Sequence, residues 1–442
     1  MPGPTLVDFH SDPSLPHAVD TVVIGGGIIG VSTALELAER GTSVLLCEKG
    51  QIGGEQSSRN WGWVRISRRD PREIPLMAEA LRIWPELDKR VGHGTGYRRA
   101  GIFFAAETER KAQWLQDWAE HLRPFQLDGH MVRGTDLEAV MPGHQMSLQG
   151  GLFTPVDGRA EPQMATPALA EGARSHGAHV MTGCAVRSLD MQGGKLAGVI
   201  TERGRVACSS VVLAGGAWSR LFAGNAGIQL PQLKVLNSVL RTSRVDGPEA
   251  AIWAGGFALR KRADGGYTVA SGTENIVDLV PDSLRLGWQF LPALREEWKS
   301  LRFRLSGRWR EEARQSRRWT ADQVTPFEQC RILDPDPASD RLEKGWQAAR
   351  SAFPALRQAK VEQSWAGLID VTPDAVPVIS GVDDVPGLYI ATGFSGHGFG
   401  IGPAAGRLMA DMVLEQSPIV DPHDFRLSRF SDGTKVAPFP SI

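Results

Sequence analysis

A run of glycines near the N-terminal end constrains the fold of this 442-residue sequence more than any other feature. Residues 21–24 are apolar and β-branched, which predicts a short buried strand. Residues 25–30 follow the pattern G-x-G-x-x-G, and residues 31–40 have the spacing of an α-helix that ends at Gly41. Residues 43–47 predict a second strand. We therefore expect a βαβ unit that binds a dinucleotide.

The glycines of this turn have distinct physical roles in such a site. Gly25 allows the tight turn, Gly27 lets a pyrophosphate approach the backbone, and Gly30 permits close packing of helix and strand. The phosphates would sit at the helix N-terminus, at Ile28 and Ile29, because free N–H groups and the helix dipole favour negative charge there.

Glu48 follows the second predicted strand. A carboxylate at this place accepts hydrogen bonds from the hydroxyls of an adenosine ribose. Lys49, beside it, is expected at the same site. A glycine-rich structural turn is the alternative interpretation, and it leaves Glu48 unexplained.

Two further segments look like parts of the same cradle. A strand at 388–391 leads into residues 392–403, which hold five glycines within ten residues, and a helix follows at 404–414. Residues 210–218 predict a strand that ends in a turn of small residues. A nicotinamide cofactor needs only the first segment, whereas a flavin held along its whole length needs all three, so we expect FAD. The contacts expected beyond the first segment are Val186, Ala214, Gly215, Trp218, Gly393, Gly396, His397, Gly398, Phe399 and Gly400.

Composition narrows the class of protein. Lys plus Arg number 49 and Asp plus Glu number 50, and this net charge of -1 argues against binding nucleic acid through bulk charge. Apolar residues make up 42% and charged residues 22%, which is typical of a globular chain. The four cysteines are widely spaced, so we expect a reducing compartment and no metal site. No signal peptide and no apolar stretch of membrane-spanning length are visible, which favours a cytoplasmic enzyme.

Together these motifs resemble the FAD-dependent amine oxidoreductases of the D-amino-acid oxidase, glycine oxidase and sarcosine oxidase superfamily. The resemblance rests on residues 25–48, 211–218, 365–379 and 393–399, which span nearly the whole chain in the family's order. Residues 365–379 contribute the sequences Trp-Ala-Gly-Leu, Thr-Pro-Asp and Pro-Val-Ile. Flavoprotein hydroxylases share the first motif, but the Gly-Asp pair of their late FAD-binding segment is absent near Gly393.

The resemblance implies an α/β fold, in which a Rossmann-type FAD-binding domain is joined to an α+β substrate domain with an antiparallel sheet and a helical insertion. The expected boundaries are 18–84, 156–224 and 362–420 for the FAD-binding domain, and 85–155 and 225–361 for the substrate domain, with the insertion at 284–345. The family's reaction is hydride transfer from the α-carbon of a neutral amine to flavin N5, after which the imine hydrolyses to a 2-oxo acid and ammonia. The protein supplies orientation and electrostatics, so no catalytic side chain is assigned.

Residues 53–65 are similar to a loop of one branch of this family, the bacterial L-amino-acid deaminases and related L-amino-acid oxidases. In that branch the loop passes the pyrophosphate and the ring face of the flavin, which implies substrate contacts from Trp63 and Arg65. Core packing is the alternative for Trp63. The branch is membrane-associated through an N-terminal anchor; none is visible here, and we expect no membrane contact. The implied cofactor contacts in this loop are Gln56, Ser57, Ser58 and Arg59.

A 2-amino acid needs a cation for its carboxylate, and the planar guanidinium of arginine matches it best. Many relatives keep this arginine after the Trp-Ala-Gly sequence, where this chain has Leu368. Residues 257–270 predict a hairpin with Arg260 and Arg262 on one face. We expect Arg260 to bind the substrate carboxylate, with Arg65 as the second candidate. A solvated hairpin tip is the alternative.

Three residues lie close to the flavin in this interpretation. Trp365 precedes a strand expected to face the flavin, so it lines either the side-chain pocket or the core. Gly398 is expected beside both cofactor and substrate. His397 lies between two glycines and could suggest a base, but the resemblance assigns it to the shape of the flavin site.

The segment 284–319 carries ten Lys or Arg against four Glu, a net charge of +6. Apolar residues from Leu291 to Leu305 recur at helical spacing, which predicts amphipathic helices. An insertion packed on its own domain, a subunit interface and a membrane-surface contact all fit this pattern, and we expect the first. The sequence leaves the oligomeric state open, and a homodimer is one alternative.

The sequence therefore predicts an FAD-dependent L-amino-acid oxidase or deaminase with O2 or a quinone as electron acceptor. One alternative is a D-amino-acid or secondary-amine dehydrogenase on the same fold. Leu368 counts against the D-specific version. Two features count against a sarcosine-type enzyme. Such enzymes carry a lysine where this chain has Gly400, and this chain has no cysteine near residues 368–370 for a covalent flavin. A non-catalytic subunit is a further alternative, but all three cofactor segments look intact.

Overall fold

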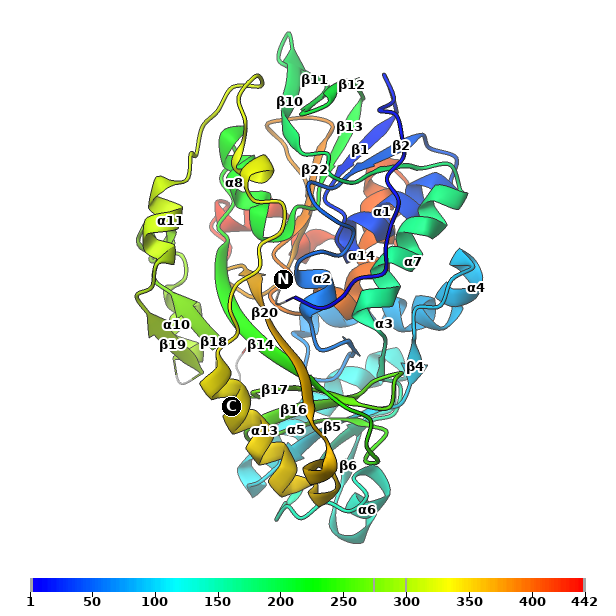
Figure 1. Ribbon diagram of the computed structural model, residues 1–442, viewed down its shortest axis with the longest axis vertical. Helices are drawn as coiled ribbons and strands as arrows, with labels where there is room; N and C mark the ends of the chain where they lie inside the picture. The colour runs from blue at the N-terminus through cyan, green and yellow to red at the C-terminus, as the bar shows by residue number, and fades with distance from the viewer. Residues whose placement is uncertain (1–2, 273–274, 299, 440–442) are drawn as a thin grey trace.

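The structure is a computed structural model that describes residues 3–272, 275–298 and 300–439. A six-stranded sheet occupies its upper half in Figure 1, in the order β21-β22-β13-β1-β2-β9, and every neighbouring pair is parallel except β21 with β22. Burial on both faces accounts for the apolar runs that predicted these strands. The strands are β1 (Thr21–Ile24), β2 (Val44–Cys47), β9 (His179–Met181), β13 (Ser210–Leu213), β21 (Val378–Gly381) and β22 (Leu388–Thr392).

Helices α1 (Ile28–Glu39), α7 (Pro162–Ser175) and α14 (Gly398–Val413) pack with this sheet. Helices α1 and α14 approach closely because α14 has glycine at their contact. A Cβ on Gly406 would lie 2.5 Å from the carbonyl carbon of Ser32. The glycines after His397 therefore serve helix packing as well as the turn.

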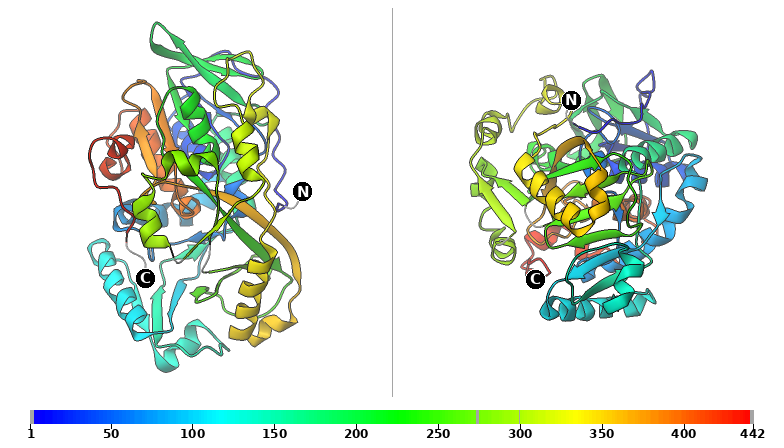
Figure 2. Two further views of the ribbon diagram at one scale, coloured as in Figure 1. Left: turned by 90° about the vertical axis from the view of Figure 1, so that its left-hand side faces the viewer. Right: turned by 60° about the horizontal axis from the view of Figure 1, so that its bottom comes forward.

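A small antiparallel sheet projects at the top of the molecule (Figures 1 and 2). Its strands are β10 (Val186–Gln192), β11 (Lys195–Thr201) and β12 (Gly204–Ala207). A second one joins β3 (Trp63–Val64), β8 (Gly158–Arg159) and β4 (Arg98–Arg99).

The ten-stranded sheet fills the lower half, and two long strands, β14 (Leu233–Thr242) and β20 (Val361–Val371), connect it to the upper half (Figure 1). Its order is β19-β18-β14-β17-β16-β15-β5-β7-β6, with β20 paired to β14. The other strands are β5 (Ile102–Ala106), β6 (His130–Val132), β7 (Gly150–Thr154), β15 (Ala251–Ala254), β16 (Phe257–Lys261), β17 (Tyr267–Ala270), β18 (Asn275–Asp278) and β19 (Leu301–Arg304).

The predicted α/β class is confirmed, with two corrections. The large sheet is mixed rather than wholly antiparallel, because β15 pairs with β5 and β18 pairs with β19 in parallel. The expected boundary before residue 362 is also displaced. Strand β20 is antiparallel to β14 along the length of β14, so residues 362–371 belong to the large sheet by their hydrogen bonds.

The remaining helices cover the large sheet and the molecule's edges. Helix α13 buries Leu342, Trp346 and Ala349, which form one stripe against β16 and β17. The helices are α2 (Gln56–Arg59), α3 (Ile74–Ile83), α4 (Leu87–Val91), α5 (Glu109–Ala119), α6 (Leu137–Val140), α8 (Ser219–Asn225) and α13 (Ser339–Ala352).

The insertion contains α9 (Pro281–Leu286), α10 (Leu291–Glu297), β19, α11 (Arg308–Arg314) and α12 (Pro326–Gln329). The predicted helical stripe is wrong beyond α10, because Leu301 begins β19 and pairs with β18. The expectation that the stripe packs on its own domain is wrong for Trp298 and Leu305, which are 60% and 74% exposed.

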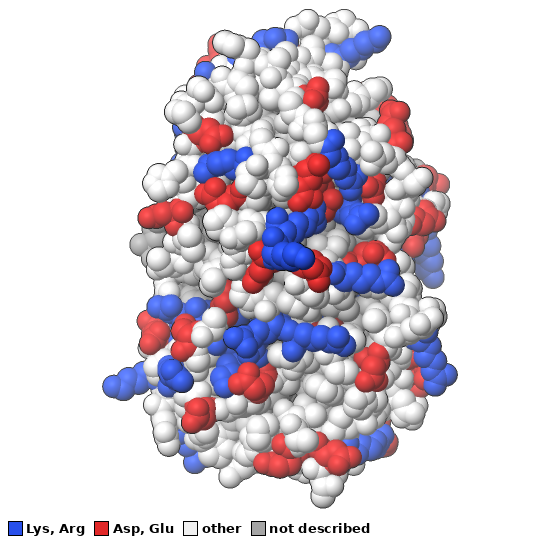
Figure 3. All heavy atoms as spheres, turned by 90° about the vertical axis from the view of Figure 1, so that its right-hand side faces the viewer, with Lys and Arg blue, Asp and Glu red and all other residues white. Residues whose placement is uncertain are grey.

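Charges of both signs are interspersed on the face shown in Figure 3, as the near-zero net charge implies. Over residues 3–272, 275–298 and 300–439, no helix is both long and apolar enough to cross a membrane. In the same ranges no group of three or more His, Cys, Asp or Glu is placed to hold a metal ion.

Candidate cofactor and substrate site

A cavity of about 390 Å³ lies where the six-stranded sheet meets the β14–β20 pair, and the three glycine-bearing segments converge on it. The predicted residues that line it are Gly25, Gly27, Ile28, Ile29, Glu48, Lys49, Gln56, Ser57, Arg59, Trp63, Arg65, Val186, Ala214, Gly215, Trp218, Gly396, His397, Gly398, Phe399 and Gly400. Five predicted residues lie outside its wall, namely Gly30, Ser58, Arg260, Trp365 and Gly393.

The first turn has the geometry that its glycines predict. Gly25 has a φ of +112°, and a Cβ there would lie 2.4 Å from the carbonyl oxygen of Ala214. A Cβ on Gly30 would lie 1.9 Å from the carbonyl oxygen of Gly25, which explains why Gly30 packs behind the turn instead of lining the cavity. Ser57 Oγ accepts a hydrogen bond from the N–H of Ile28 at 2.8 Å, so α2 caps the start of α1 from outside.

Glu48 lies at the end of β2 with its carboxylate at the cavity wall. Its two oxygens accept hydrogen bonds from Gly26 N and Gly50 N, each at 2.7 Å. Burial raises the pKa of Glu48, while Lys49 and these two N–H groups oppose the rise. A carboxylate fixed in this way keeps lone pairs free for hydroxyl donors in the cavity.

Two cations of this region, Lys49 and Arg59, are held by contacts within the protein. Lys49 Nζ contacts Glu55 Oε1 at 2.7 Å and lies 4.5 Å from the ring centroid of Trp218. Arg59, predicted as a phosphate or flavin contact, lines the cavity and donates to Asp334 at 2.5 Å and to the carbonyl oxygen of Ala366 at 2.9 Å. Arg59 therefore fastens the cavity wall to β20, and its contact with the cofactor stays a prediction.

The late glycine-rich turn is fastened by a buried acid that sequence reasoning missed. Asp370 accepts hydrogen bonds from Gly393 N at 2.7 Å, Gln232 Nε2 at 2.9 Å and Thr392 Oγ1 at 3.0 Å. Burial raises the pKa of Asp370, and these donors oppose the rise. The available signal was an acidic residue directly after the run of apolar and small residues 365–369 in β20.

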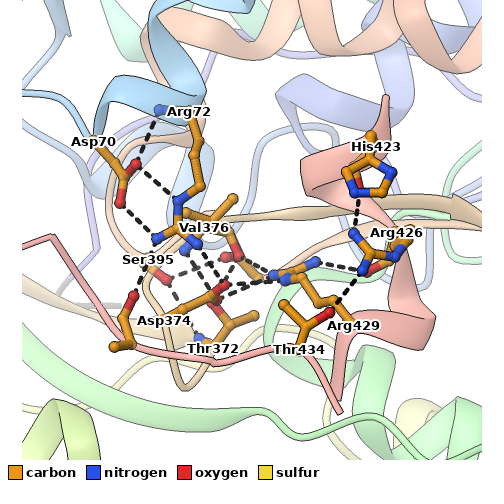
Figure 4. Close-up of polar contacts among 12 residues, drawn as sticks. Asp70, Arg72, Thr372, Asp374, Val376, Ser395, His423, Arg426, Arg429 and Thr434 are labelled. Atoms are coloured by element: carbon orange, nitrogen blue, oxygen red, sulfur yellow. Dashed lines mark hydrogen bonds and ion pairs between the residues drawn. The ribbon is translucent and has the colours of Figure 1, made fainter. Parts of the chain in front are cut away.

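A second buried acid, Asp374, holds the C-terminal segment against this turn (Figure 4). Its carboxylate accepts from Arg429 Nε at 3.0 Å, Arg429 Nη2 at 3.1 Å and Arg72 Nη1 at 3.2 Å. Asp374 and Arg429 are 1% and 2% exposed. The turn beside it connects to the cofactor segment, because Thr372 N donates to Ser395 Oγ at 3.3 Å. We name this arrangement of Arg72, Asp374 and Arg429 the carboxylate clasp.

Arg65 and Trp63 point to a ligand in the cavity. Trp63 is buried, and its Nε1–H has no hydrogen-bond partner in the part of the chain that the structure describes. Burial, with the charges of Arg69 and Arg68, lowers the pKa of Arg65 to about 9. Arg65 donates to the carbonyl oxygen of Ser67, and no carboxylate of the described residues lies within ion-pair distance of it. Asp157 and Glu73 favour its charge from a longer distance, and a desolvated cation without an ion pair in contact is suited to a ligand carboxylate.

The backbone that carries Arg65 is fixed by Asp157, which is fully buried. Its carboxylate accepts from Ile66 N at 2.6 Å and from Ser67 Oγ. Burial raises the pKa of Asp157 to about 6, against the opposing effect of these donors and of Arg65.

The structure corrects the two other substrate predictions. Arg260 is 1% exposed and donates to Glu161 Oε1 at 2.7 Å, to Thr268 Oγ1 at 3.0 Å and to a backbone carbonyl. The hairpin was predicted, but the partner of Arg260 comes from a distant segment and takes its charge. Trp365 is a core residue, with Nε1 donating to the carbonyl oxygen of Arg59 at 3.2 Å.

Glu73 is a buried acid beside the cofactor turn that the sequence did not single out as a site residue. It is fully buried, with Oε1 3.2 Å from Arg69 Nη1 and Oε2 3.3 Å from His397 Nδ1. Arg69 also donates to the carbonyl oxygen of His397 at 2.9 Å. Glu73, just before α3, and Arg69 therefore hold the Gly-His-Gly turn. No local sequence pattern predicts these contacts.

Residues 20–412 match the family described as FAD dependent oxidoreductase (DAO). The match covers most of the chain, and the protein belongs to this family, with FAD as its cofactor. The resemblance inferred from the sequence motifs is thus confirmed.

Two solved structures are similar over nearly the whole chain. The L-amino acid deaminase from Proteus myxofaciens in complex with anthranilate is 34% identical, with a TM-score of 0.93 and coverage of 97% of each chain. The L-amino acid deaminase from Proteus vulgaris is 32% identical, with a TM-score of 0.91 and coverage of 96% of this chain and 100% of that one.

Curated relatives point to other amines. The 4-methylaminobutanoate oxidase (formaldehyde-forming) of Paenarthrobacter nicotinovorans is 28% identical over 427 residues, which are 94% of this chain and 46% of that protein. The chain spans less than half the length of the first curated relatives that it matches.

The residues present fit FAD. The glycines at 25 and 27 leave the backbone of the first turn open, the start of α1 faces the cavity, and Glu48 presents a fixed acceptor there. Glu48 would hold the ribose and the α1 terminus the pyrophosphate. The turn at 396–400 would lie along the ring system.

Proposed function

We propose that the protein catalyses the FAD-dependent oxidative deamination of L-amino acids. The observation that carries this proposal is Arg65, a desolvated cation at the cavity wall without an ion-pair partner among the described residues. An α-carboxylate matches the guanidinium in shape and charge. The similarity to two L-amino acid deaminase structures supports an amino acid as the substrate.

The chain's own residues would bind and orient the substrate. Bound FAD supplies the oxidant that removes hydride from the α-carbon, and the imine then hydrolyses to a 2-oxo acid and ammonia. Arg65 would hold the carboxylate at one end, and Trp63 Nε1–H is a second donor for it. Arg69 donates to the carbonyl oxygen of His397 and so keeps this turn in place. The site is therefore rigid before the substrate arrives.

We infer O2 as the electron acceptor, with hydrogen peroxide as its product. A quinone is the other acceptor to test. Readmitting air to substrate-reduced enzyme separates the two, because an oxidase regains its flavin absorbance with formation of peroxide and a dehydrogenase stays reduced until a quinone is added.

A secondary amine is the second candidate substrate, since a curated relative is named as a methylamino-acid oxidase. The experiment is anaerobic titration of the purified flavoprotein with L-phenylalanine, L-leucine and L-glutamine, the corresponding D-amino acids, and sarcosine. Bleaching of the flavin band by L-forms alone supports the proposal. Bleaching by D-forms or sarcosine alone overturns it in favour of the alternative.

A further inference from the structure

A second cavity, of about 250 Å³, lies between α8 and the insertion. Its walls come from residues 217–234, from the start of α9 and from α11 with the chain that follows it. The volume is several times the share of about 30 Å³ that one water takes in the liquid. A small solute therefore fits.

Cations outnumber carboxylates around this cavity. The lining cations are Arg220, Lys234, Arg308, Arg317 and Arg318, and the lining carboxylates are Asp278, Asp282 and Glu312. Two further arginines contact these carboxylates from behind, Arg285 at Asp282 and Arg304 at Asp278. Seven cations thus surround three anions.

The carboxylates are already saturated by their own partners. Asp282 has Arg220 at 2.9 Å, Arg285 at 3.1 Å and Arg317 at 2.5 Å. Burial would raise the pKa of Asp282, but the hydrogen bond and charge of Arg220, with Arg285 and Arg317, lower it to about 2. The acid is ionised at every working pH, and three cations still leave a positive excess beside it.

Glu312, another carboxylate of the cavity wall, is likewise paired with more than one cation. Its Oε1 lies 3.1 Å from Lys234 Nζ and 2.5 Å from Arg308 Nη2. Among the described residues Arg318 donates to the carbonyl oxygen of Asn225, at 2.8 Å, and to no carboxylate. Positive charge in a partly desolvated cavity attracts an anion more strongly than the same charge at an open surface.

We propose that this second cavity binds a small oxyanion that carries two negative charges. The bound anion would be shared by Arg308, Arg317 and Arg318, whose donors exceed what the acids accept. A phosphate group and a dicarboxylate have this chemistry in common.

The site adjoins the cofactor cavity. Arg220 N donates to Gln232 Oε1 at 3.1 Å, and Gln232 Nε2 donates to Asp370 Oδ2 at 2.9 Å. Asp370 lines the first cavity and holds Gly393 N. Three hydrogen bonds thus connect Arg220, in the wall of the second cavity, to the cofactor turn.

The test is isothermal titration calorimetry on the FAD-loaded protein, with ionic strength held constant by sodium chloride. The titrants are inorganic phosphate, glycerol phosphate and succinate, which distinguish free phosphate, a phosphate ester and a dicarboxylate. We expect single-site binding of at least one titrant. Arg308→Gln and Arg317→Gln each leave their carboxylate another cation, and each is expected to weaken binding about tenfold.

Arg314→Gln is the matched control, because Arg314 is exposed on the same helix as Arg308 and outside the cavity wall. It should leave the dissociation constant unchanged. Lys234→Gln replaces either test variant if that variant lacks the flavin spectrum of the folded protein. Absence of binding by all three titrants overturns the proposal, as does an equal effect of the control and test variants.

Discussion

Glu73 Oε2 and His397 Nδ1 lie 3.3 Å apart at the base of the cofactor turn. Burial lowers the pKa of His397, the charge of Glu73 opposes this, and Arg65 and Arg69 add to the lowering. Burial would raise the pKa of Glu73, but Arg69 and His397 lower it below its usual value. At neutral pH the pair is therefore a carboxylate beside a neutral imidazole.

Glu73→Gln is expected to lower the pKa of His397 further, because it removes the one neighbour that favours the imidazolium. The measurement is an NMR titration of the histidine Cε1–H signals, with His397→Asn to assign the resonance. Glu79→Gln, on α3 and paired with Arg82, is the control and should leave the titration unchanged. A raised pKa in Glu73→Gln would contradict the assignment of Glu73 as the stabilising charge.

Arg65→Gln is expected to raise KM for an amino acid substrate by roughly 10–150-fold, since a hydrogen-bonded contact to a charged group contributes about 1.5–3 kcal/mol. Steady-state kinetics on the preferred substrate measure it, and Arg65→Lys should recover part of the loss. A substrate analogue that lacks the carboxylate is the control. If the analogue loses as much as the amino acid, Arg65 acts on the fold and not on the carboxylate.

Gly25→Ala is expected to abolish FAD binding, because its Cβ would press into the carbonyl oxygen of Ala214. Gly41→Ala separates steric overlap from backbone strain. Gly41 has a φ of +79° but no atom within 4 Å of an added Cβ, so this variant should lose only about 1–2 kcal/mol of stability. Flavin absorbance after gel filtration, with urea unfolding, compares the two. Retention of FAD by Gly25→Ala would refute the close approach.

Asp374→Asn breaks the carboxylate clasp and should cost about 3–5 kcal/mol of unfolding free energy, because it leaves the buried guanidinium of Arg429 without its anion. Arg72→Gln should cost much less, since the side chain of Arg72 is 28% exposed and Arg429 still holds Asp374. Chemical denaturation of both variants measures the difference. Equal losses would mean that the buried pair is not the principal contact.

Asp157 predicts a pH dependence of stability. Its folded pKa of about 6 lies above the unfolded value of about 3.9, so its contribution is fully present below pH 3.9 and is lost as pH rises through 6. The Asp157→Asn variant has no carboxyl group at this position, so it does not lose this contribution to stability as pH rises. Between pH 4 and 6.5 the unfolding free energy of the wild type should fall relative to the variant by roughly 2 kcal/mol. Parallel pH profiles would show that Asp157 titrates normally.

Local patterns predicted the parts of the site that one segment builds alone. The strand, the turn at Gly25 and the helix after it lie within residues 21–39, and neighbouring residues decide each of them. The prediction that Arg260 binds the substrate was wrong for the opposite reason. Alternation gave its hairpin and face, but its partner Glu161 lies 99 residues away, and no spacing rule reports such a pair.

The same limit applies to the missed acids and to the insertion. Glu73 and Asp370 act through residues that only the tertiary fold brings near. Leu301 carried the spacing of a helix, yet parallel pairing with β18 made it a strand. Tertiary contacts override local periodicity where a segment is short.

The carboxylate clasp joins segments that are synthesised far apart in time. The glycine turn at residues 25–30 leaves the ribosome first, but the turn that completes the cradle and Arg429, which locks it, leave last. Strand β13, which pairs with β1, comes from the middle of the chain, and β22, which pairs with β13, comes from near its end. Because residues within 25–29 and 391–400 line the same cavity, we expect a chain that stops before residue 391 to lack one wall of the cofactor site.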